Sequence, residues 1–399
     1  MGGIRIAEIL AAGADRYLET HRVPHVVAKA CAAIRHCRTG LLGTHARFCT
    51  QGHLVGVWYN ACRNRSCPSC AFYRVQRWLE RVVKRLLGCA HHHLIFTIPH
   101  ELNFLWTLNY VVMGELLFHA ARDALLELAR DAQHLGATPG VVMALHTWGQ
   151  QLPMHPHLHC LATAGGVDQD GNWVQPRRRS FLPAEPLKQL FRGKFIYRLR
   201  GLVRQGRLRL PDGCDGAGVD RLCRELRHKR WNVRICERYE DPTRVLNYLG
   251  RYLHGGPIGQ SRLLAFDGHT VTFRYKDYRD IGPDGPRLKP LSLPTDEFIR
   301  RLLQHVPPKR FHMVRGFGLY RRGGSTAALH ERVRQALPIQ PEVHAALASP
   351  FASSPGKNDV PGNCPACGSA LYLVVYTPRG KSVHRVIYPP RGSPITAAA

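Results

Sequence analysis

The 399-residue sequence has few acidic residues and no long apolar run. It contains 28 Asp and Glu against 56 Lys and Arg, which gives a formal net charge of +28. No window has eighteen uninterrupted apolar residues, which argues against a membrane-spanning helix. The N-terminus lacks the basic head and apolar run of a secretory signal, so we expect a cytosolic protein.

The basic excess predicts a polyanionic partner, because it is larger than solubility requires and is dominated by arginine. A protein that binds a membrane surface would need an amphipathic anchor with basic residues on one face and bulky apolar residues on the other, and the sequence shows none. Nucleic acid is therefore the expected partner. A hydrophobic content of 44% is that of a globular protein, and the length allows two or three domains.

The thirteen cysteines are odd in number and clustered, which in a cytosolic chain indicates metal ligands rather than disulfides. The spacing of Cys67-Pro-Ser-Cys70 lets two thiolates wrap one Zn²⁺ ion. Reduced structural cysteines are the alternative. The expected zinc ligands are Cys49, His53, Cys67 and Cys70. Cys62 is the first substitute for one of them, and Cys37 is the second.

Two histidines in the segment His155-Pro-His-Leu-His-Cys160 indicate a second kind of metal site. On a β-strand His157 and His159 point to one face, while Leu158 points into the core behind them. Two neutral imidazoles side by side can hold one divalent cation. A His-rich surface loop is the alternative interpretation.

A third ligand is expected from the preceding strand. Residues 141–148 are typical of a strand, and a turn centred near Gln151 would place His146 roughly opposite His157. His146 is therefore the candidate third ligand, and Gln150 is the alternative. The expected ion is Mg²⁺ or Mn²⁺.

Residues 245–254 are typical of a helix that Gly255-Gly256 closes, with Tyr248 and Tyr252 one turn apart on one flank. A metal-binding histidine pair together with two tyrosines provides the groups that are needed to cut single-stranded DNA. The metal polarises the scissile phosphate, and a tyrosine oxygen attacks phosphorus. The alternative is that the tyrosines are packed aromatics. Arginines predicted to contact DNA are Arg63, Arg65 and Arg251, and ordinary solvated charges explain Arg63 and Arg65 equally well.

Apolar periodicity predicts an α+β fold. Helices are expected within residues 4–36, 72–87, 104–135, 183–230 and 295–305. Strands are expected at residues 91–99, 158–164 and 231–239 and in a hairpin at 263–273, with a Pro/Gly-rich loop at 282–294.

The motifs together resemble those of the IS91 family of insertion-sequence transposases, the bacterial relatives of Helitrons. The resemblance covers roughly residues 25–335, and one departure is Cys49-Thr-Gln-Gly-His53, where family members often have a C-x-x-C-G element. The segments that carry it are Ala61–Cys70, Phe96–Asn103, His155–Cys160, Tyr248–Tyr252, Arg262–Asp267 and Thr272–Tyr278.

The resemblance implies an HUH-endonuclease-like palm, which is an antiparallel sheet with helices behind it, preceded by a small helical and zinc-binding module. It also implies rolling-circle transposition, with single-stranded DNA at the element ends and target DNA as partners, and a 5′ phosphate linked to tyrosine. A plasmid replication initiator or relaxase would use the same chemistry. A zinc-containing DNA-binding protein without enzymatic activity is the alternative from another class.

Three domains are expected along the chain. The zinc-binding DNA-recognition region is expected at residues 1–90, and the catalytic domain at 91–335 with a helical insertion at about 183–230. The tail at residues 336–399 carries the Cys364-Pro-Ala-Cys367 knuckle, which lacks an obvious partner pair, and is expected to be partly disordered.

Overall fold

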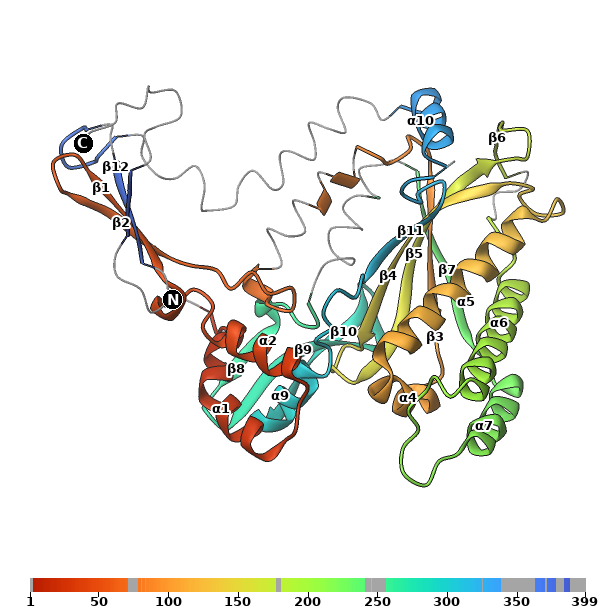
Figure 1. Ribbon diagram of the computed structural model, residues 1–399, viewed down its shortest axis with the longest axis horizontal. Helices are drawn as coiled ribbons and strands as arrows, with labels where there is room; N and C mark the ends of the chain where they lie inside the picture. The colour runs from red at the N-terminus through yellow and green to blue at the C-terminus, as the bar shows by residue number, and fades with distance from the viewer. Residues whose placement is uncertain are drawn as a thin grey trace.

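The computed structural model describes residues 3–70, 78–79, 81–82, 84–176, 181–240, 245, 256–324, 326–338, 363–369, 372–377 and 384–387. Within these ranges helices combine with three sheets whose strands all pair antiparallel, so the predicted α+β class is confirmed (Figure 1). No helix among the described residues is long and apolar enough to cross a membrane.

The largest sheet has the strand order β11-β4-β5-β3-β7, with β6 beside β5. Its strands are β3 (His91–Thr97), β4 (Thr138–Trp148), β5 (Met154–Val167), β6 (Trp173–Val174), β7 (Asn232–Tyr239) and β11 (Val314–Gly318). One face is covered by α4 (Asn103–Leu108), α5 (Tyr110–Arg130), α6 (Ala184–Arg204) and α7 (Gly216–His228), as Figure 1 shows. This layer arrangement agrees with the expected antiparallel sheet with helices behind it.

Strand alternation decides which face of β5 meets the helices. Leu158, Cys160 and Ala162 are fully buried in the core that the sheet shares with α4 to α7. Phe96 of β3 meets Phe191 of α6 there edge-on, with ring centroids 5.1 Å apart. The alternate residues of β5, which include His157 and His159, therefore point to the opposite face.

A second core lies between the N-terminal helices and a segment more than 200 residues later in the chain. The helices α1 (Ile6–Thr20) and α2 (His25–Arg35) pack on β8 (Leu263–Phe266), β9 (Thr270–Gly282), β10 (Gly285–Pro294) and α9 (Thr295–Leu303). Arg16 of α1 forms an ion pair with Asp296 of α9 at 2.7 Å. The region expected at residues 1–90 thus shares its core with residues 258–306.

The strand β10 corrects one expectation, because residues 282–294 were predicted to form a loop. The range contains four prolines, of which Pro290 and Pro294 lie in the regularly paired part of an edge strand that, among the described strands, pairs only with β9. They are four residues apart, so both backbone nitrogens face the same side of the strand. Proline is tolerated at an edge, where its nitrogen needs no partner strand.

The tip of the β4–β5 hairpin joins the two cores. Leu152 adopts a left-handed backbone with φ 63° and is fully buried in the second core. Its carbonyl accepts hydrogen bonds from Gln304 Nε2 at 2.9 Å and from His305 Nε2 at 3.2 Å. The hairpin that carries the histidines is therefore held at its far end.

A separate four-stranded sheet joins residues 44–59 to residues 372–387. Its order is β13-β12-β1-β2, formed by β1 (Thr44–Cys49), β2 (Leu54–Tyr59), β12 (Tyr372–Thr377) and β13 (His384–Ile387). In Figure 1 it projects to the left of the main body. The remaining elements are α10 (Thr326–Ala336) and the short 3-10 turns η1 (Gly40–Leu42), η2 (His100–Leu102) and η3 (Gln260–Arg262).

Candidate metal centre and nucleic-acid interface

Three histidines meet on the face of the large sheet opposite α4 to α7. His146 of β4 pairs with His157 of β5 in the strand register, as the turn near Gln151 predicted. Each of His146, His157 and His159 offers a ring nitrogen, and the three nitrogens lie within 4.8 Å of one another. The Nε2 atoms of His157 and His159 are 3.2 Å apart. Metal–nitrogen bonds of about 2.1 Å place neighbouring ligands about 3.0–3.4 Å apart, so this pair has the separation that one ion requires.

The two β5 histidines are neutral and oriented for coordination. Burial lowers the pKa of both His157 and His159 to about 3, so neither ring carries a proton charge at neutral pH. His157 Nδ1 lies 2.7 Å from the carbonyl oxygen of His155. Because only a protonated nitrogen can donate to that oxygen, the lone pair of His157 belongs to Nε2, which faces His159.

A fourth histidine supports the site from behind. His93 Nε2 of β3 lies 3.1 Å from His159 Nδ1, so a His159 that coordinates through Nε2 donates its other proton to His93. The sequence predicted a strand here but not this contact. Alternation alone gives no signal for it, because the contact depends on the register that pairs His93 with Leu161, two residues beyond His159.

Gln150, the alternative third ligand, lies elsewhere. Its Oε1 accepts a hydrogen bond from the backbone nitrogen of Lys276 at 3.3 Å, and its carbonyl accepts from Arg262. Both contacts hold it against β9 and the residue before β8. The structure therefore gathers His146, and not Gln150, with the β5 pair.

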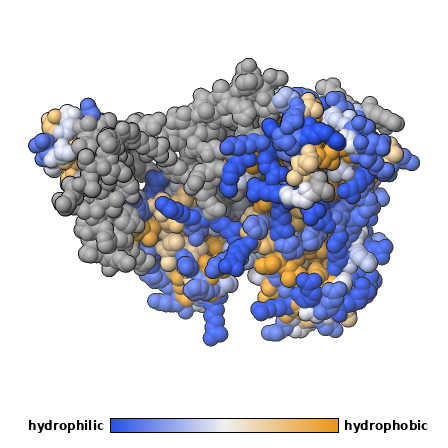
Figure 2. Space-filling model, turned by 45° about the horizontal axis from the view of Figure 1, so that its top comes forward, coloured by the Kyte–Doolittle hydropathy of each residue, from blue (hydrophilic) through white to orange (hydrophobic). Residues whose placement is uncertain are grey.

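A cavity of about 740 Å³ opens beside His146 and is rich in arginine. Trp148 and Trp78 line it with apolar rings, and the Trp148 ring stacks on His146 with centroids 4.5 Å apart. Its arginines are Arg65, Arg81, Arg85, Arg315, Arg321 and Arg322, of which Arg81, Arg321 and Arg322 are exposed. Cationic walls with aromatic rings are the combination that binds single-stranded nucleic acid. Figure 2 shows hydrophilic residues over much of the described surface, with apolar patches between them.

The two arginines predicted from the cysteine region differ in their surroundings. Arg65 donates to the carbonyls of Phe311 at 2.7 Å, Pro307 at 3.3 Å and Pro308 at 2.5 Å. Its guanidinium therefore braces the loop before β11, which leaves it less available to a phosphate than the sequence suggested. Arg63 is exposed.

Tyr248, Tyr252 and Arg251 lie outside the described residues, as does the helix predicted around them, of which only Val245 is described. The residues that flank this segment are informative. Val245 is fully buried against the same face of the large sheet, in the cluster that contains Val142, Ala144 and Leu161. Gly256 and Pro257 line the arginine-rich cavity with His146.

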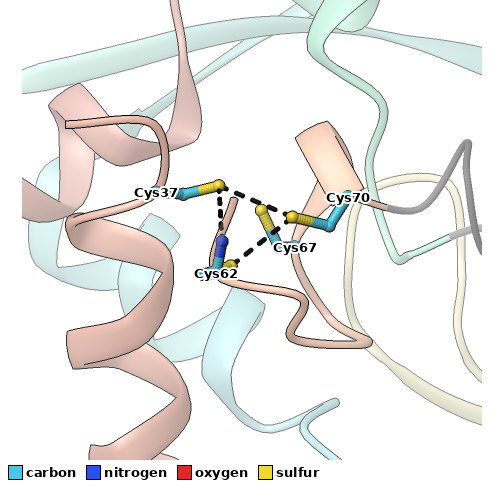
Figure 3. A group of neighbouring side chains, drawn as sticks. All are labelled: Cys37, Cys62, Cys67 and Cys70. Carbon is cyan, nitrogen blue, oxygen red and sulfur yellow. Dashed lines mark hydrogen bonds between the residues drawn. The ribbon is translucent and has the colours of Figure 1, made fainter. Parts of the chain in front are cut away.

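Four cysteines form the first sulfur cluster: Cys37, just after α2, and three from the loop that follows β2, Cys62, Cys67 and Cys70 (Figure 3). The sulfur of Cys70 lies 3.6 Å from those of Cys37 and Cys62. Zinc–sulfur bonds of about 2.3 Å place the sulfurs of a tetrahedral site about 3.8 Å apart. Hydrogen bonds from neighbouring thiols, that of Cys62 first, lower the pKa of Cys37, which favours the thiolate form of this side chain.

The expected ligand set is corrected by this arrangement. Cys49 and His53 are not in the cluster of Cys67 and Cys70, but form a second group with Cys364 and Cys367. The two substitutes considered from the sequence, Cys62 and Cys37, complete the first cluster instead. Sequence spacing ranked the ligands by their distance along the chain, whereas β1 and β2 carry Cys49 and His53 away from Cys67 and Cys70.

Comparisons with known proteins show which family the chain belongs to. A family model described as "Transposase zinc-binding domain" matches residues 9–98, and one described as "Putative transposase" matches residues 140–327. The chain is 30% identical over 387 residues to the "Transposase for insertion sequence element IS801" of Pseudomonas savastanoi pv. phaseolicola, which covers 93% of this chain and 86% of the relative. It belongs to the IS91 family of insertion-sequence transposases.

A second relative agrees with this assignment. The "Putative transposase y4qJ" of Sinorhizobium fredii (strain NBRC 101917 / NGR234) is 36% identical over 313 residues, covering 76% of this chain and 78% of the relative. No solved structure matches the chain. Family membership implies DNA substrates and DNA strand transfer, and the zinc-binding region and its cysteine cluster support structural Zn²⁺.

Proposed function

We propose that this transposase cuts and rejoins single-stranded DNA by attack of Tyr248 or Tyr252 on a phosphodiester, with a divalent ion held by His146, His157 and His159. The observation that carries the proposal is the three-histidine group on the sheet face opposite α4 to α7, beside an arginine-rich cavity. The described residues before and after the two tyrosines support it, because Val245 packs in the apolar cluster on that face and Gly256 lines the cavity.

The protein's own groups divide the chemistry between them. A bound Mg²⁺ or Mn²⁺ supplies Lewis-acid polarisation of the scissile phosphate. The tyrosine hydroxyl gives up its proton as its oxygen forms a bond to phosphorus, the bond from phosphorus to the 3′ oxygen breaks, and that oxygen takes up a proton to leave a 3′ hydroxyl. The strand stays attached through its 5′ phosphate to tyrosine, and a second attack on that linkage rejoins DNA. With two tyrosines, cutting and rejoining can alternate.

The neutral imidazoles and the exposed arginines have separate roles in this scheme. His157 and His159 keep their lone pairs free for the ion because burial holds both rings neutral. Arg81, Arg321 and Arg322 attract the phosphates of the strand, and Trp148 offers a ring on which a base can stack. The proposed substrates are the single-stranded ends of the mobile element and a target DNA. Arg63 and Arg251 are proposed as further phosphate contacts. The proposed location is the cytoplasm.

The donor set predicts which ion works best. All three candidate ligands are nitrogens, whereas Mg²⁺ prefers oxygen ligands and gives up its water reluctantly. Transition ions bind imidazole more tightly, so Mn²⁺ should support cleavage at lower concentration than Mg²⁺. The structural Zn²⁺ of the zinc-binding region is proposed to sit between Cys37, Cys62, Cys67 and Cys70.

The test is a denaturing gel of the protein with a labelled single strand taken from the element's ends. We expect a covalent adduct that depends on the divalent ion, and each of Tyr248→Phe and Tyr252→Phe should retain an adduct but fail to complete strand transfer. Tyr239→Phe, a tyrosine at the end of β7, is the matched control and should behave as the unaltered protein. Adduct that persists in the Tyr248→Phe, Tyr252→Phe double variant would refute the tyrosine mechanism.

A further inference from the structure

We infer that Cys49, His53, Cys364 and Cys367 form a second, separate Zn²⁺ site that fastens the C-terminal segment to the hairpin of β1 and β2. The matching zinc-binding family model ends at residue 98, so two of these ligands lie far outside it. The inference concerns residues with no part in the proposed cleavage reaction, and it stands or falls independently of it.

The four ligand atoms have the spacing of a tetrahedral site. All lie within 4.8 Å of one another. The sulfurs of Cys49 and Cys367 are 3.6 Å apart, and His53 Nδ1 is 3.5 Å from Cys49 Sγ and 3.8 Å from Cys364 Sγ. For Zn²⁺, bond lengths of about 2.3 Å to sulfur and 2.0–2.1 Å to nitrogen predict edges of about 3.8 Å and 3.6 Å.

Two tight turns present these ligands to each other. In the first, Cys49 and His53 flank a turn closed by a hydrogen bond from the backbone nitrogen of Gly52 to the carbonyl of Cys49 at 2.9 Å. In the second, the nitrogen of Gly368 donates to the carbonyl of Cys364 at 2.8 Å. Gly52 and Gly368 both have positive φ, 84° and 72°, a conformation that glycine adopts without strain.

Strand pairing brings the two turns together. The strand β12 follows Cys367 by five residues and pairs antiparallel with β1, in a register that sets Tyr372 opposite Cys49. The ligand turns therefore meet at one end of the four-stranded sheet, although Cys49 and Cys367 are 318 residues apart in the chain. A small sheet with little core of its own gains most from such a cross-link.

A disulfide is the competing use of these sulfurs, because Cys49 and Cys367 are near each other. It would use only two of the four groups and would leave His53 and Cys364 without a role. A zinc ion uses all four, and three sulfurs with one imidazole is among the sets that structural zinc sites employ.

The test counts zinc in the purified full-length protein after chelator washing. We expect two zinc ions per chain, falling to one in His53→Ala and in Cys367→Ser. His53 and Cys367 are chosen because both are exposed, so their replacement should leave the fold intact. Cys214→Ser, which alters a cysteine outside both clusters, is the control and should retain two.

Thiol labelling then tests whether the two turns share one ion. Exposed Cys367 should resist alkylation in the unaltered protein and become reactive in His53→Ala, while Cys70 in the first cluster stays protected. One zinc ion per chain in the unaltered protein, or an undiminished count in both His53→Ala and Cys367→Ser, would overturn the inference. A Cys49–Cys367 disulfide in protein prepared under reducing conditions would overturn it as well.

Discussion

The contact between His93 and His159 predicts that His93 raises the affinity for the proposed catalytic ion without binding the ion itself. His93→Phe keeps a ring of similar size in β3 but removes the nitrogen that lies 3.1 Å from His159 Nδ1. Burial lowers the pKa of His93 to about 4, so at neutral pH the ring is uncharged and its Nε2 can accept the His159 proton. The variant leaves that N–H buried without its acceptor.

The size of the effect follows from that one lost hydrogen bond. A buried donor without an acceptor costs about 1–3 kcal/mol, and loss of an outer partner of a metal ligand typically lowers metal affinity about 10- to 100-fold. These figures agree, since a tenfold change corresponds to about 1.4 kcal/mol. We therefore expect the Mn²⁺ concentration for half-maximal cleavage to rise about 10- to 100-fold, with little change of rate at saturating Mn²⁺.

Single-turnover cleavage of a labelled oligonucleotide, titrated with Mn²⁺, measures this shift. His92→Phe is the matched control, because His92 is buried in the same strand but stacks on Phe181, with ring centroids 4.7 Å apart. His93→Gln, which restores an acceptor oxygen, should recover part of the affinity. An unchanged Mn²⁺ requirement in His93→Phe, or an equal shift in His92→Phe, would show that the contact does not tune the site.

Three other outcomes follow from the same geometry. His157→Ala should lower cleavage about 10²-fold or more, because an ion ligand is lost, while fluorescence anisotropy shows nearly unchanged DNA affinity; a parallel loss of binding would contradict the division of roles. Binding to single strands should weaken with salt with a log–log slope near −0.7 per phosphate neutralised, and a flat dependence would count against the arginine-rich interface. Cys67→Ser should release zinc from the first cluster and open residues 37–70 to proteolysis, with Cys214→Ser as the control; an intact zinc count would exclude Cys67 as a ligand.

Local patterns in the sequence were sufficient for the histidine strand. The alternation His157, Leu158, His159 fixed which side chains share a face, because successive residues of any strand point to opposite sides. The short turn near Gln151 then set the register that pairs His146 with His157, as observed. The α+β class followed from periodicity in the same way, whereas the placement of helices behind an antiparallel sheet was implied by the family resemblance. The family was predicted from the order of the motifs along the chain.

Contacts between distant segments were beyond the reach of such patterns. The order Cys49, His53, Cys62, Cys67, Cys70 suggested one zinc site, but the pairing of β1 with β12 gives Cys49 and His53 to Cys364 and Cys367. Spacing cannot reveal this, because a metal selects ligands by distance in space. The expected 1–90 region likewise shares its core with residues 258–306, because α1 and α2 bury their apolar stripes on β8 to β10 and α9.

The strand β10 and the His93 contact show the same division between sequence and tertiary structure. A proline predicts a loop unless its nitrogen faces the open edge of a sheet, and only the strand order β10-β9-β8 puts it there. His93 lies in an apolar strand like any core residue, and only the pairing of β3 with β5 brings it to His159. The sequence alone determined the chemistry that each segment can offer, through residue type and strand or helix period. Tertiary structure decided which segments meet, because long-range pairing depends on the packing of the whole chain.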